Sequence, residues 1–290
     1  NLADRLWTRD NDFGSSGLAN TARQQFTLVK TVLDHADYDQ HIGRELAAVA
    51  GNLGLVSGWF AFDNGDHNTA AACYREAFVL AERGGDDSLV CDVLDALRQQ
   101  AWTAGNMRTA LQLSLRASER ARHDPSARSQ AQLAAREAVA HAAVGDRREC
   151  DRALAAAWRQ VDRGLDDPND PIRLHYITPD EIATTEAHAH SYLGRHEQAA
   201  ANYRASLLGT DHPLRDQASY QAYYAASLAR LGDTTTAYSE GLKALDLLEG
   251  PVHSPRLVNV LHPVHHIAHQ SRAEEATQFT ARYNHLIGSS

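Results

Sequence analysis

A glycine recurs along this chain at spacings of 40, 40, 49 and 38 residues, and the residues around it recur with it. Five and twelve residues after the glycine, the side chain is small in every copy. The glycines are Gly65, Gly105, Gly145, Gly194 and Gly232, and the small residues are Ala70, Ala110, Cys150, Ala199, Ala237, Ala77, Ala117, Ala157, Ser206 and Ala244. A period of roughly 20 to 50 residues is typical of stacked supersecondary units, so the chain is predicted to be an array.

Each unit is predicted to be a helix, a tight turn and a second helix. In the first copy, Ala70, Cys73, Tyr74 and Ala77 are spaced as on one face of a helix. The glycine ends the preceding helix, because it adopts a left-handed C-cap conformation at little cost. The small side chains let the two helices approach closely. The position nine residues after the glycine is looser, with Tyr74, Ser114, Leu154, Tyr203 and Gly241. The position seven before it is again mostly small, with Gly58, Arg98, Ala138, Ala187 and Ala225.

The Gly-Asp turn, followed by small, aromatic and small residues, resembles the tetratricopeptide repeat (TPR) over residues 50–287. The resemblance implies an all-α fold, a right-handed superhelical solenoid of TPR-like helix-turn-helix pairs. Five copies are clear, and a weaker sixth runs through Ser271, Ala276 and Tyr283. The period exceeds the roughly 34 residues usual for this repeat, so the helices or their connections must be longer.

Three segments are similar to one family in particular. They are "GWFAFDNGDHNTAAACYREAFVLAERGGDDSLVCDVL", the preceding "YDQHIGRELAAVAGNLGLVSGW" and the later "PDEIATTEAHAHSYLGRHEQA". They resemble the TPR region of actinobacterial transcriptional regulators that carry an N-terminal Cro/repressor-type helix-turn-helix. No helix-turn-helix precedes "LWTRDNDFGSSG", so the DNA-binding activity that the family implies falls on no residue of this sequence. The chain begins with Asn, and we expect an upstream part to be missing.

The longest interval between glycines contains "GLDDPNDPIRLHYITPDE". We therefore predict N-terminal TPR-like repeats over residues 21–163, an inserted loop over 164–178 and C-terminal repeats over 179–290. Residues 1–20, with Gly14, Ser15, Ser16 and Gly17, are predicted to be the remnant of a linker. Pro179 suits the first turn of a helix that Thr178 caps. The inserted loop is either a functional segment lying over the solenoid or a spacer between two halves, and the spacer is favoured.

Composition limits the function. The net charge of −9 argues against nucleic acid as a partner of this chain. The sequence suggests no apolar stretch near the roughly 20 residues of a membrane span, and its start lacks the features of a signal peptide, which indicates a cytoplasmic location. Cys73, Cys91 and Cys150 have no paired spacing and are predicted to be small buried residues.

No phosphate-binding loop, nucleophile elbow or metalloprotease motif is present in the sequence. His262, His265, His266 and His269 are spaced to face one side of a helix and could hold a metal, but Pro263 interrupts that helix and no nearby Asp completes the set. In "HAHSYLGRH" the histidines fall on different faces. We expect no enzymatic activity, no metal and no cofactor.

The TPR resemblance implies that partners bind on the concave side, which the first helix of each pair lines. Tryptophans beside aspartates there favour a partner with an apolar anchor and a positive charge. Phe62 and Trp102 share one offset and are expected side by side. The alternative is that Trp59 and Phe62 belong to the core. The implied groove residues are Asn52, Leu55, Trp59, Phe62, Asp92, Asp95, Gln99, Trp102, Gln132, Val139, Glu181, Thr184, His188 and Tyr192.

Two functions of different classes remain open. The first is a ligand- or peptide-sensing and dimerisation module of a transcriptional regulator, acting on an upstream DNA-binding domain. The second is a stand-alone TPR adaptor that assembles protein partners without a small ligand. For either we expect a peptide, small-molecule or protein ligand in the groove, a homodimer, no membrane, and DNA contact only through the missing N-terminal domain.

Overall fold

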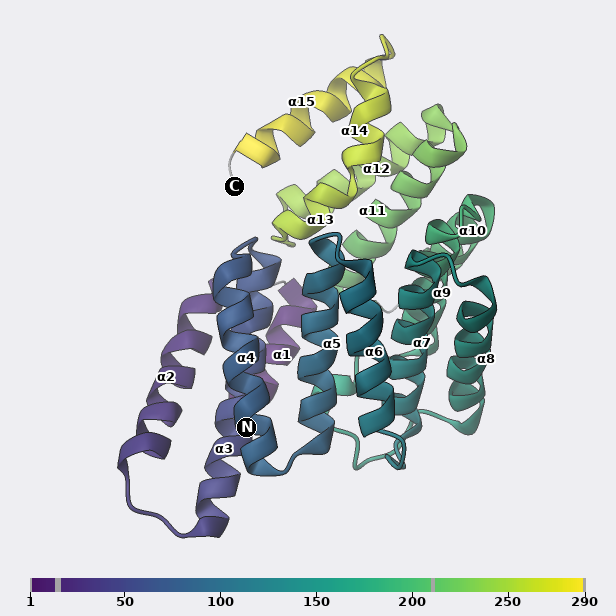
Figure 1. The fold of residues 1–290 in the computed structure, drawn as a ribbon. Coiled ribbons are helices and arrows are strands. Elements are labelled where there is room, and N and C mark those ends of the chain that lie inside the picture. Colours follow the sequence, from purple (N-terminus) through teal and green to yellow (C-terminus); the bar gives the residue numbers. More distant parts are fainter. Residues whose placement is uncertain (1, 14–16, 210–211, 289–290) are drawn as a thin grey trace. The chain divides into compact units, whose positions relative to one another are not determined.

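The computed structural model describes residues 2–13, 17–209 and 212–288 (Figure 1). Within these ranges the chain forms fifteen α-helices and one 3₁₀ turn, η1, with no strand, so the predicted all-α TPR-like fold is confirmed. The helices are α1 Leu2–Phe13, α2 Ala19–His35, α3 Gln40–Asp63, α4 His67–Gly84, α5 Asp87–Thr103, α6 Met107–Arg120, α7 Ala127–Ala143, α8 Arg147–Arg163, η1 Ile172–Leu174, α9 Pro179–Tyr192, α10 His196–Leu207, α11 Leu214–Leu231, α12 Thr234–Glu249, α13 Pro255–Val260, α14 His262–Ala268 and α15 Glu274–Gly288.

The repeating glycines make the predicted turns. Gly65 has φ +83°, and the other four turn glycines have φ between +73° and +84°, so all five adopt the left-handed conformation. At the first turn, the Asp66 amide donates to the Ala61 carbonyl at 2.8 Å, which satisfies a free carbonyl at the end of α3. The Asp66 carboxylate then accepts from the Thr69 amide at 3.0 Å and caps α4. One dipeptide therefore ends one helix and starts the next.

The small residues lie where helices of a pair meet, and all ten are buried. The residues seven before and nine after the turn glycine differ in size between the copies. A Cβ on Gly58 would lie 2.4 Å from the Tyr74 ring, so the glycine makes room for that ring. The second copy reverses the sizes, with a fully buried Arg98 in place of the glycine and Ser114 in place of the tyrosine. In these two copies a large residue at one position goes with a small residue at the other, whereas the fifth copy has Ala225 and Gly241, both small.

Residue contacts divide the chain into two compact units. Unit 1 contains residues 2–8 and 17–182 of the described chain, and unit 2 contains residues 9–13, 183–209 and 212–288. In unit 1, α2 packs on α3, and three helix pairs follow, α3 with α4, α5 with α6 and α7 with α8. In unit 2, α11 packs on α10 and α12, and α13, α14 and α15 complete the core. The boundary lies inside α9, four residues beyond the start that we predicted for the C-terminal repeats.

Residues 2–13 correct one prediction. We expected a linker, but this segment is the helix α1, and Ala3 and Leu6 are buried in a core cluster with Phe26 and Phe60. Two apolar residues three positions apart in a charged segment are a weak signal for a buried helix, which explains why this helix was not predicted. Gly14, Ser15 and Ser16 lie outside the described residues.

Helix α3 corrects a second prediction, the absence of an apolar stretch near the length of a membrane span. By length and composition alone, this 24-residue helix could cross a membrane, although no such apolar stretch was expected from the sequence. Its apolar residues, including Leu53, Val56 and Phe60, are buried against neighbouring helices. The long apolar run is therefore accounted for by the core of unit 1. The three cysteines are also buried, as predicted.

Candidate functional site

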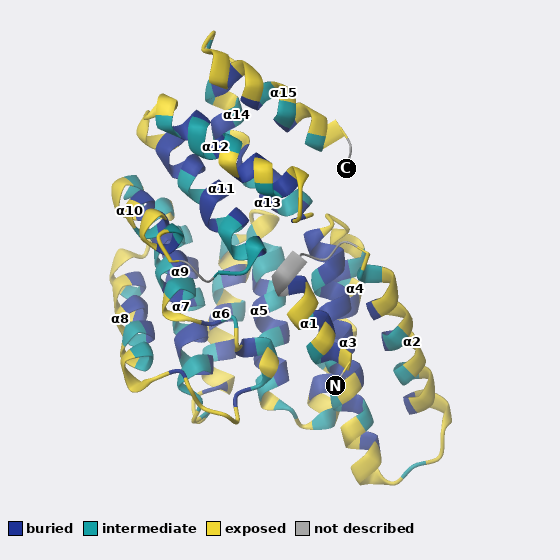
Figure 2. Ribbon diagram, turned by 180° about the vertical axis from the view of Figure 1, so that it is seen from behind, coloured by how far each residue is buried: buried dark blue, intermediate teal, exposed yellow. Residues whose placement is uncertain are grey.

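The first helices of unit 1, α3, α5 and α7, are neighbours, because α3 contacts α5 and α5 contacts α7. We call the surface of these helices that carries Asn52, Asp92 and Gln132 the inner face; it corresponds to the predicted groove. Figure 2 shows α1 and the loop of residues 164–178 on the side of the molecule turned away in Figure 1. Trp7 of α1 donates from Nε1 to Asn52 Oδ1 at 3.4 Å. The chain itself therefore covers part of the inner face.

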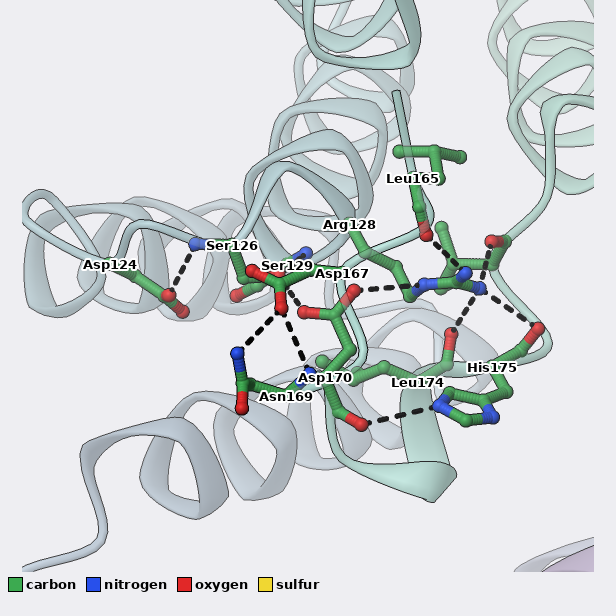
Figure 3. A network of polar contacts seen from close by, with 11 residues as sticks. Asp124, Ser126, Arg128, Ser129, Leu165, Asp167, Asn169, Asp170, Leu174 and His175 are labelled. Carbon is green, nitrogen blue, oxygen red and sulfur yellow. Dashed lines mark hydrogen bonds and ion pairs between the residues drawn. The ribbon is translucent and has the colours of Figure 1, made fainter. Parts of the chain in front are cut away.

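The loop of residues 164–178 is fixed to α7 by Arg128 (Figure 3). Nε of Arg128 pairs with Asp170 Oδ2 at 3.1 Å, and Asp170 Oδ1 accepts from Ser126 Oγ at 2.5 Å. The Asp170 side chain is only 2% exposed. The two Nη atoms of Arg128 donate to four backbone carbonyls of the loop, those of Leu165, Leu174, His175 and Ile177, the last three at 3.4, 3.1 and 2.8 Å. The loop is thus a packed part of unit 1, rather than the plain spacer that the sequence favoured.

Arg173 extends from η1 of this loop to α5. Its Nε forms an ion pair with Asp92 Oδ2, and its Nη2 donates to Ser88 Oγ at 2.9 Å. Ser88 and Asp92 are four residues apart on α5, so they lie on one face of the helix. Nearby, Gln132 Nε2 of α7 donates to the Tyr176 hydroxyl at 2.8 Å. The positive charge that was expected from a partner at Asp92 is supplied here by the chain itself.

Asp95, one turn further along α5, has different partners. Its Oδ1 accepts from Arg98 Nε at 2.6 Å, and its Oδ2 lies 3.8 Å from Arg136 Nε. Arg136 also donates to Glu181 Oε1 at 2.9 Å. Arginines of the repeat helices α5 and α7 therefore neutralise Asp95, whereas an arginine of the loop neutralises Asp92.

The two carboxylates also differ in their pKa values. Burial raises the pKa of Asp92 to about 6, because desolvation outweighs the attraction of Arg173. Burial also disfavours ionisation of Asp95, but Arg98 and Arg136 together outweigh it and hold the pKa of Asp95 below its usual value. Burial raises the pKa of the neighbouring Tyr176 hydroxyl. Asp95 is therefore a permanent charge near neutral pH, and Asp92 titrates just below it.

Several predicted groove residues belong to the core. Leu55 and Phe62 are 4% and 2% exposed, and the Trp59 ring packs on Phe62 at 5.9 Å between centroids. Val139 and Thr184 are buried as well. The expectation that Leu55 and Phe62 face a ligand is therefore wrong, because a first helix contacts both its partner helix and the next pair, which leaves only a narrow exposed stripe.

Gln99 and Trp102 remain partly exposed, further along α5. The Arg98 guanidinium carbon lies 5.8 Å from the centre of the Trp102 ring, a cation–π geometry. Trp102 therefore lies at the edge of the charged group of Asp95. Trp102 and Gln99 are therefore the predicted groove residues of α5 that keep some exposure beside the paired acids.

The last predicted residues belong to unit 2. His188 Nδ1 lies 2.6 Å from the Tyr203 hydroxyl, in hydrogen-bond contact, and the Tyr203 and Tyr223 rings stack at 5.6 Å. His188 also packs edge-on against Tyr223 at 4.3 Å. Tyr192 is exposed. The fourteen predicted groove residues thus divide between two units, and His188 and Tyr192 are assigned to a different unit from Asp92.

The histidine run offers no assembled metal site. Among the described residues, no group of three or more His, Cys, Asp or Glu side chains is arranged to hold a metal. The helix begins at His262 with Pro263 in its first turn, and His265 stacks on Tyr283 at 4.5 Å. Burial and the neighbouring histidines lower the pKa of His265. His265 therefore packs against α15, whereas His262, His266 and His269 are exposed.

Sequence reasoning missed the residues that organise the inner face, namely Ser88, Arg128, Arg136, Arg173 and Tyr176. Arg173 carried one usable signal, since it is the only arginine or lysine in the proline-rich segment "DDPNDPIRLHYITP". Arg128 and Arg136 lie eight residues apart on α7, which places them on one side of that helix. Neither signal identifies the acid that each arginine meets.

No protein-family model matches the sequence, and no curated protein matches it. Solved structures do resemble it. One is BtubC (BKLC) from P. vanneervenii, with TM-score 0.52 and 14% identity over 84% of this chain and 96% of that one. Another is the Signal Transduction ATPase with Numerous Domains (STAND) protein PH0952 from Pyrococcus horikoshii, which has a tetratricopeptide repeat sensor, with TM-score 0.53 and 12% identity over 99% of this chain. The chain spans 43% of the length of that protein. These likenesses show the fold, a TPR-like array of helix pairs.

Proposed function

We propose that this chain is a protein-interaction module that binds a peptide segment on the inner face of unit 1. One observation carries the proposal. The segment 164–178 of the chain already lies on this face, with Arg173 at Asp92 and Ser88 and with Tyr176 at Gln132. The side chains of α5 and α7 are therefore suited to a short segment that carries an arginine and an aromatic group.

The partly exposed end of the face supplies the remaining contact area. Gln99 and Trp102 follow Asp95 on α5, and a half-exposed tryptophan is a frequent anchor in peptide recognition. The net charge of −9 favours a basic partner over an acidic one. A peptide with one arginine and one apolar anchor is the partner class that fits these residues.

We further propose that the module is the sensor of a transcriptional regulator that dimerises and acts in the cytoplasm. The support is the resemblance of the repeat sequences to such regulators, together with the fold shared with a STAND protein whose TPR region is named a sensor. DNA contact would belong to a domain encoded before Asn1. An in-frame helix-turn-helix there supports this role, and a specific, salt-resistant gel shift by residues 1–290 alone contradicts it.

The alternative is an adaptor that assembles protein partners without a small ligand. A dimer whose affinity for its protein partner does not change with any small molecule or peptide would favour the adaptor. Sedimentation at high concentration also bears on the choice, since a mass near 31.8 kDa would remove the dimerisation part of the regulator proposal.

A peptide array tests the interaction module directly. Arginine-containing peptides that bind the wild-type chain should bind Trp102→Ala more weakly by roughly 2 kcal/mol, about 30-fold, with an unchanged helical spectrum. Val79→Ala, at a 65% exposed position on α4, is the matched control and should bind normally. Equal binding by Trp102→Ala and the control contradicts the proposal. If Trp102→Ala unfolds, Gln99→Ala tests the same face.

A further inference from the structure

The contact between Arg173 and α5 has an unusual origin. Asp92 and Ser88 belong to the repeat array itself, whereas Arg173 belongs to the insert that stretches one repeat interval to 49 residues. The residues are 81 and 85 positions apart. The repeat helix α5 therefore presents a carboxylate and a hydroxyl on one face. The guanidinium of Arg173, from the inserted segment, binds both of them.

Two different sets of contacts hold the loop and its arginine. At the start of α7, Ser126 and Arg128 both bind the Asp170 side chain, and Arg128 also donates to backbone carbonyls of the loop. Among the described residues of the loop, Arg173 is the one whose side chain reaches Asp92 and Ser88 on α5. Rotation of this side chain away from α5 does not by itself break the contacts of Arg128 with Asp170, Leu165 and Ile177.

The surroundings of Arg173 favour such a release. Ile172 is 44% exposed and His175 is exposed, so both neighbours of the Arg173–Leu174 pair already face solvent. η1 is only three residues long, and a side-chain rotation within it does not disturb a long helix. The part of the loop that must move is therefore the Arg173 side chain, while Arg128 holds the backbone of Leu174 and His175.

Replacement of Arg173 by the arginine of a peptide should change the free energy of the Asp92 site little. A buried ion pair gains little over its desolvation cost, but a buried carboxylate left without a partner is strongly unfavourable. An incoming guanidinium restores the pair with Asp92 and the bond to Ser88 as Arg173 leaves. Lysine cannot restore both in the same planar geometry, because its ammonium is a point charge.

We propose that Asp92 and Ser88 form an arginine-recognition site, and that Arg173 is its intramolecular occupant, which the arginine of a bound peptide displaces. The site assignment stands on these contacts, and the peptide rests on the function proposed above. In the resting chain Arg173 lowers the affinity for any arginine ligand. Only a peptide with additional contacts, such as those at Trp102, competes with it successfully.

Calorimetric titration with N-acetyl-arginine methylamide tests the site without a known partner. Arg173→Ala should bind this probe at least about tenfold more tightly than wild type, because the competing group is gone. The double variant Asp92→Asn/Arg173→Ala should lose the binding, and the lysine analogue should bind Arg173→Ala more weakly than the arginine probe. Arg152→Ala, which removes an exposed arginine of α8 with 74% side-chain exposure, is the matched control and should behave as wild type.

Equal affinity of wild type and Arg173→Ala, or binding that survives in the double variant, overturns the proposal. If Arg173→Ala does not fold by circular dichroism, Arg173→Lys replaces it, with a smaller gain expected and no gain as the contradicting result. The two proposals fail separately. Probe binding with no partner on the peptide array contradicts the interaction function, whereas partner binding that needs no arginine and ignores Arg173 contradicts the recognition site.

Discussion

The two units satisfy the polar groups of their first helices in different ways. In unit 1, the acids of α5 are neutralised by arginines from α5, α7 and the loop of residues 164–178. In unit 2, His188 of α9 is satisfied by a hydrogen bond to Tyr203 and by packing on Tyr223. A buried charge needs a charged partner, and the repeat alone does not supply one for Asp92. Aromatic groups need only stacking and one hydrogen bond, so neighbouring helices suffice.

The largest effect should follow removal of the loop's anchor. Arg128→Ala leaves Asp170 buried without its charged partner and frees four loop carbonyls, so the free energy of unfolding of unit 1 should fall by about 3 to 5 kcal/mol. Hydrogen exchange should rise in the loop and α7 while α10–α12 of unit 2 keep their protection. Arg152→Ala should change neither region. Unchanged exchange in the loop would mean that Arg128 does not hold it.

The next effect concerns pH and Asp92. Its folded pKa of about 6 lies above the usual 3.8, so the folded chain holds this proton more tightly than the unfolded chain. Stability is therefore lost as pH rises from about 4 through 6, and it is constant above. Asp92→Asn does not titrate, so wild type should lose up to about 3 kcal/mol relative to this variant between pH 4 and pH 7.5. Urea unfolding of both proteins at each pH measures the difference. A wild type that gains on the variant over this range would show that Arg173 overcomes the burial of Asp92.

An added methyl group tests how closely the helices approach each other in each unit. A Cβ on Gly58 meets Tyr74 at 2.4 Å, and a Cβ on Gly241 meets Phe279 at 2.7 Å. Gly58→Ala and Gly241→Ala should each cost about 2 kcal/mol, the first in unit 1 and the second in unit 2. Gly288→Ala, which has open space around it, is the control for the helix propensity of alanine. Thermal unfolding of the three variants decides the point, and a neutral Gly58→Ala would contradict the close approach of α3 and α4.

The smallest effect should come from the aromatic group of unit 2. Tyr203→Phe removes the hydroxyl that contacts His188 Nδ1 but keeps the ring stack with Tyr223, so the loss should be about 1 kcal/mol. Tyr192→Phe, at an exposed position, should cost nothing measurable. Chemical unfolding measures both. A loss as large as that of Arg128→Ala would mean that hydrogen bonding, rather than stacking, holds this group together.

Local patterns were enough to predict the repeat. A glycine with a left-handed φ, an aspartate that caps the next helix and small residues at fixed offsets are all read within one helix pair, so Gly65 and Asp66 could be interpreted directly. The Thr178 cap was predicted in the same way and is confirmed, since its Oγ1 accepts from the Glu181 amide at 3.2 Å. The charged helix α1 was missed because only Ala3, Leu6 and Trp7 carry its apolar face.

The sequence alone therefore determined the all-α repeat, the positions of its turns and the acidic, aromatic character of α5. Only the tertiary structure decided that the loop of residues 164–178 lies on the inner face and that Arg173 meets Asp92 across 81 residues. The physical reason is distance along the chain. Turns and helix contacts depend on neighbours within about 20 residues, whereas the partner of a buried charge is set by the packing of elements that share no local pattern.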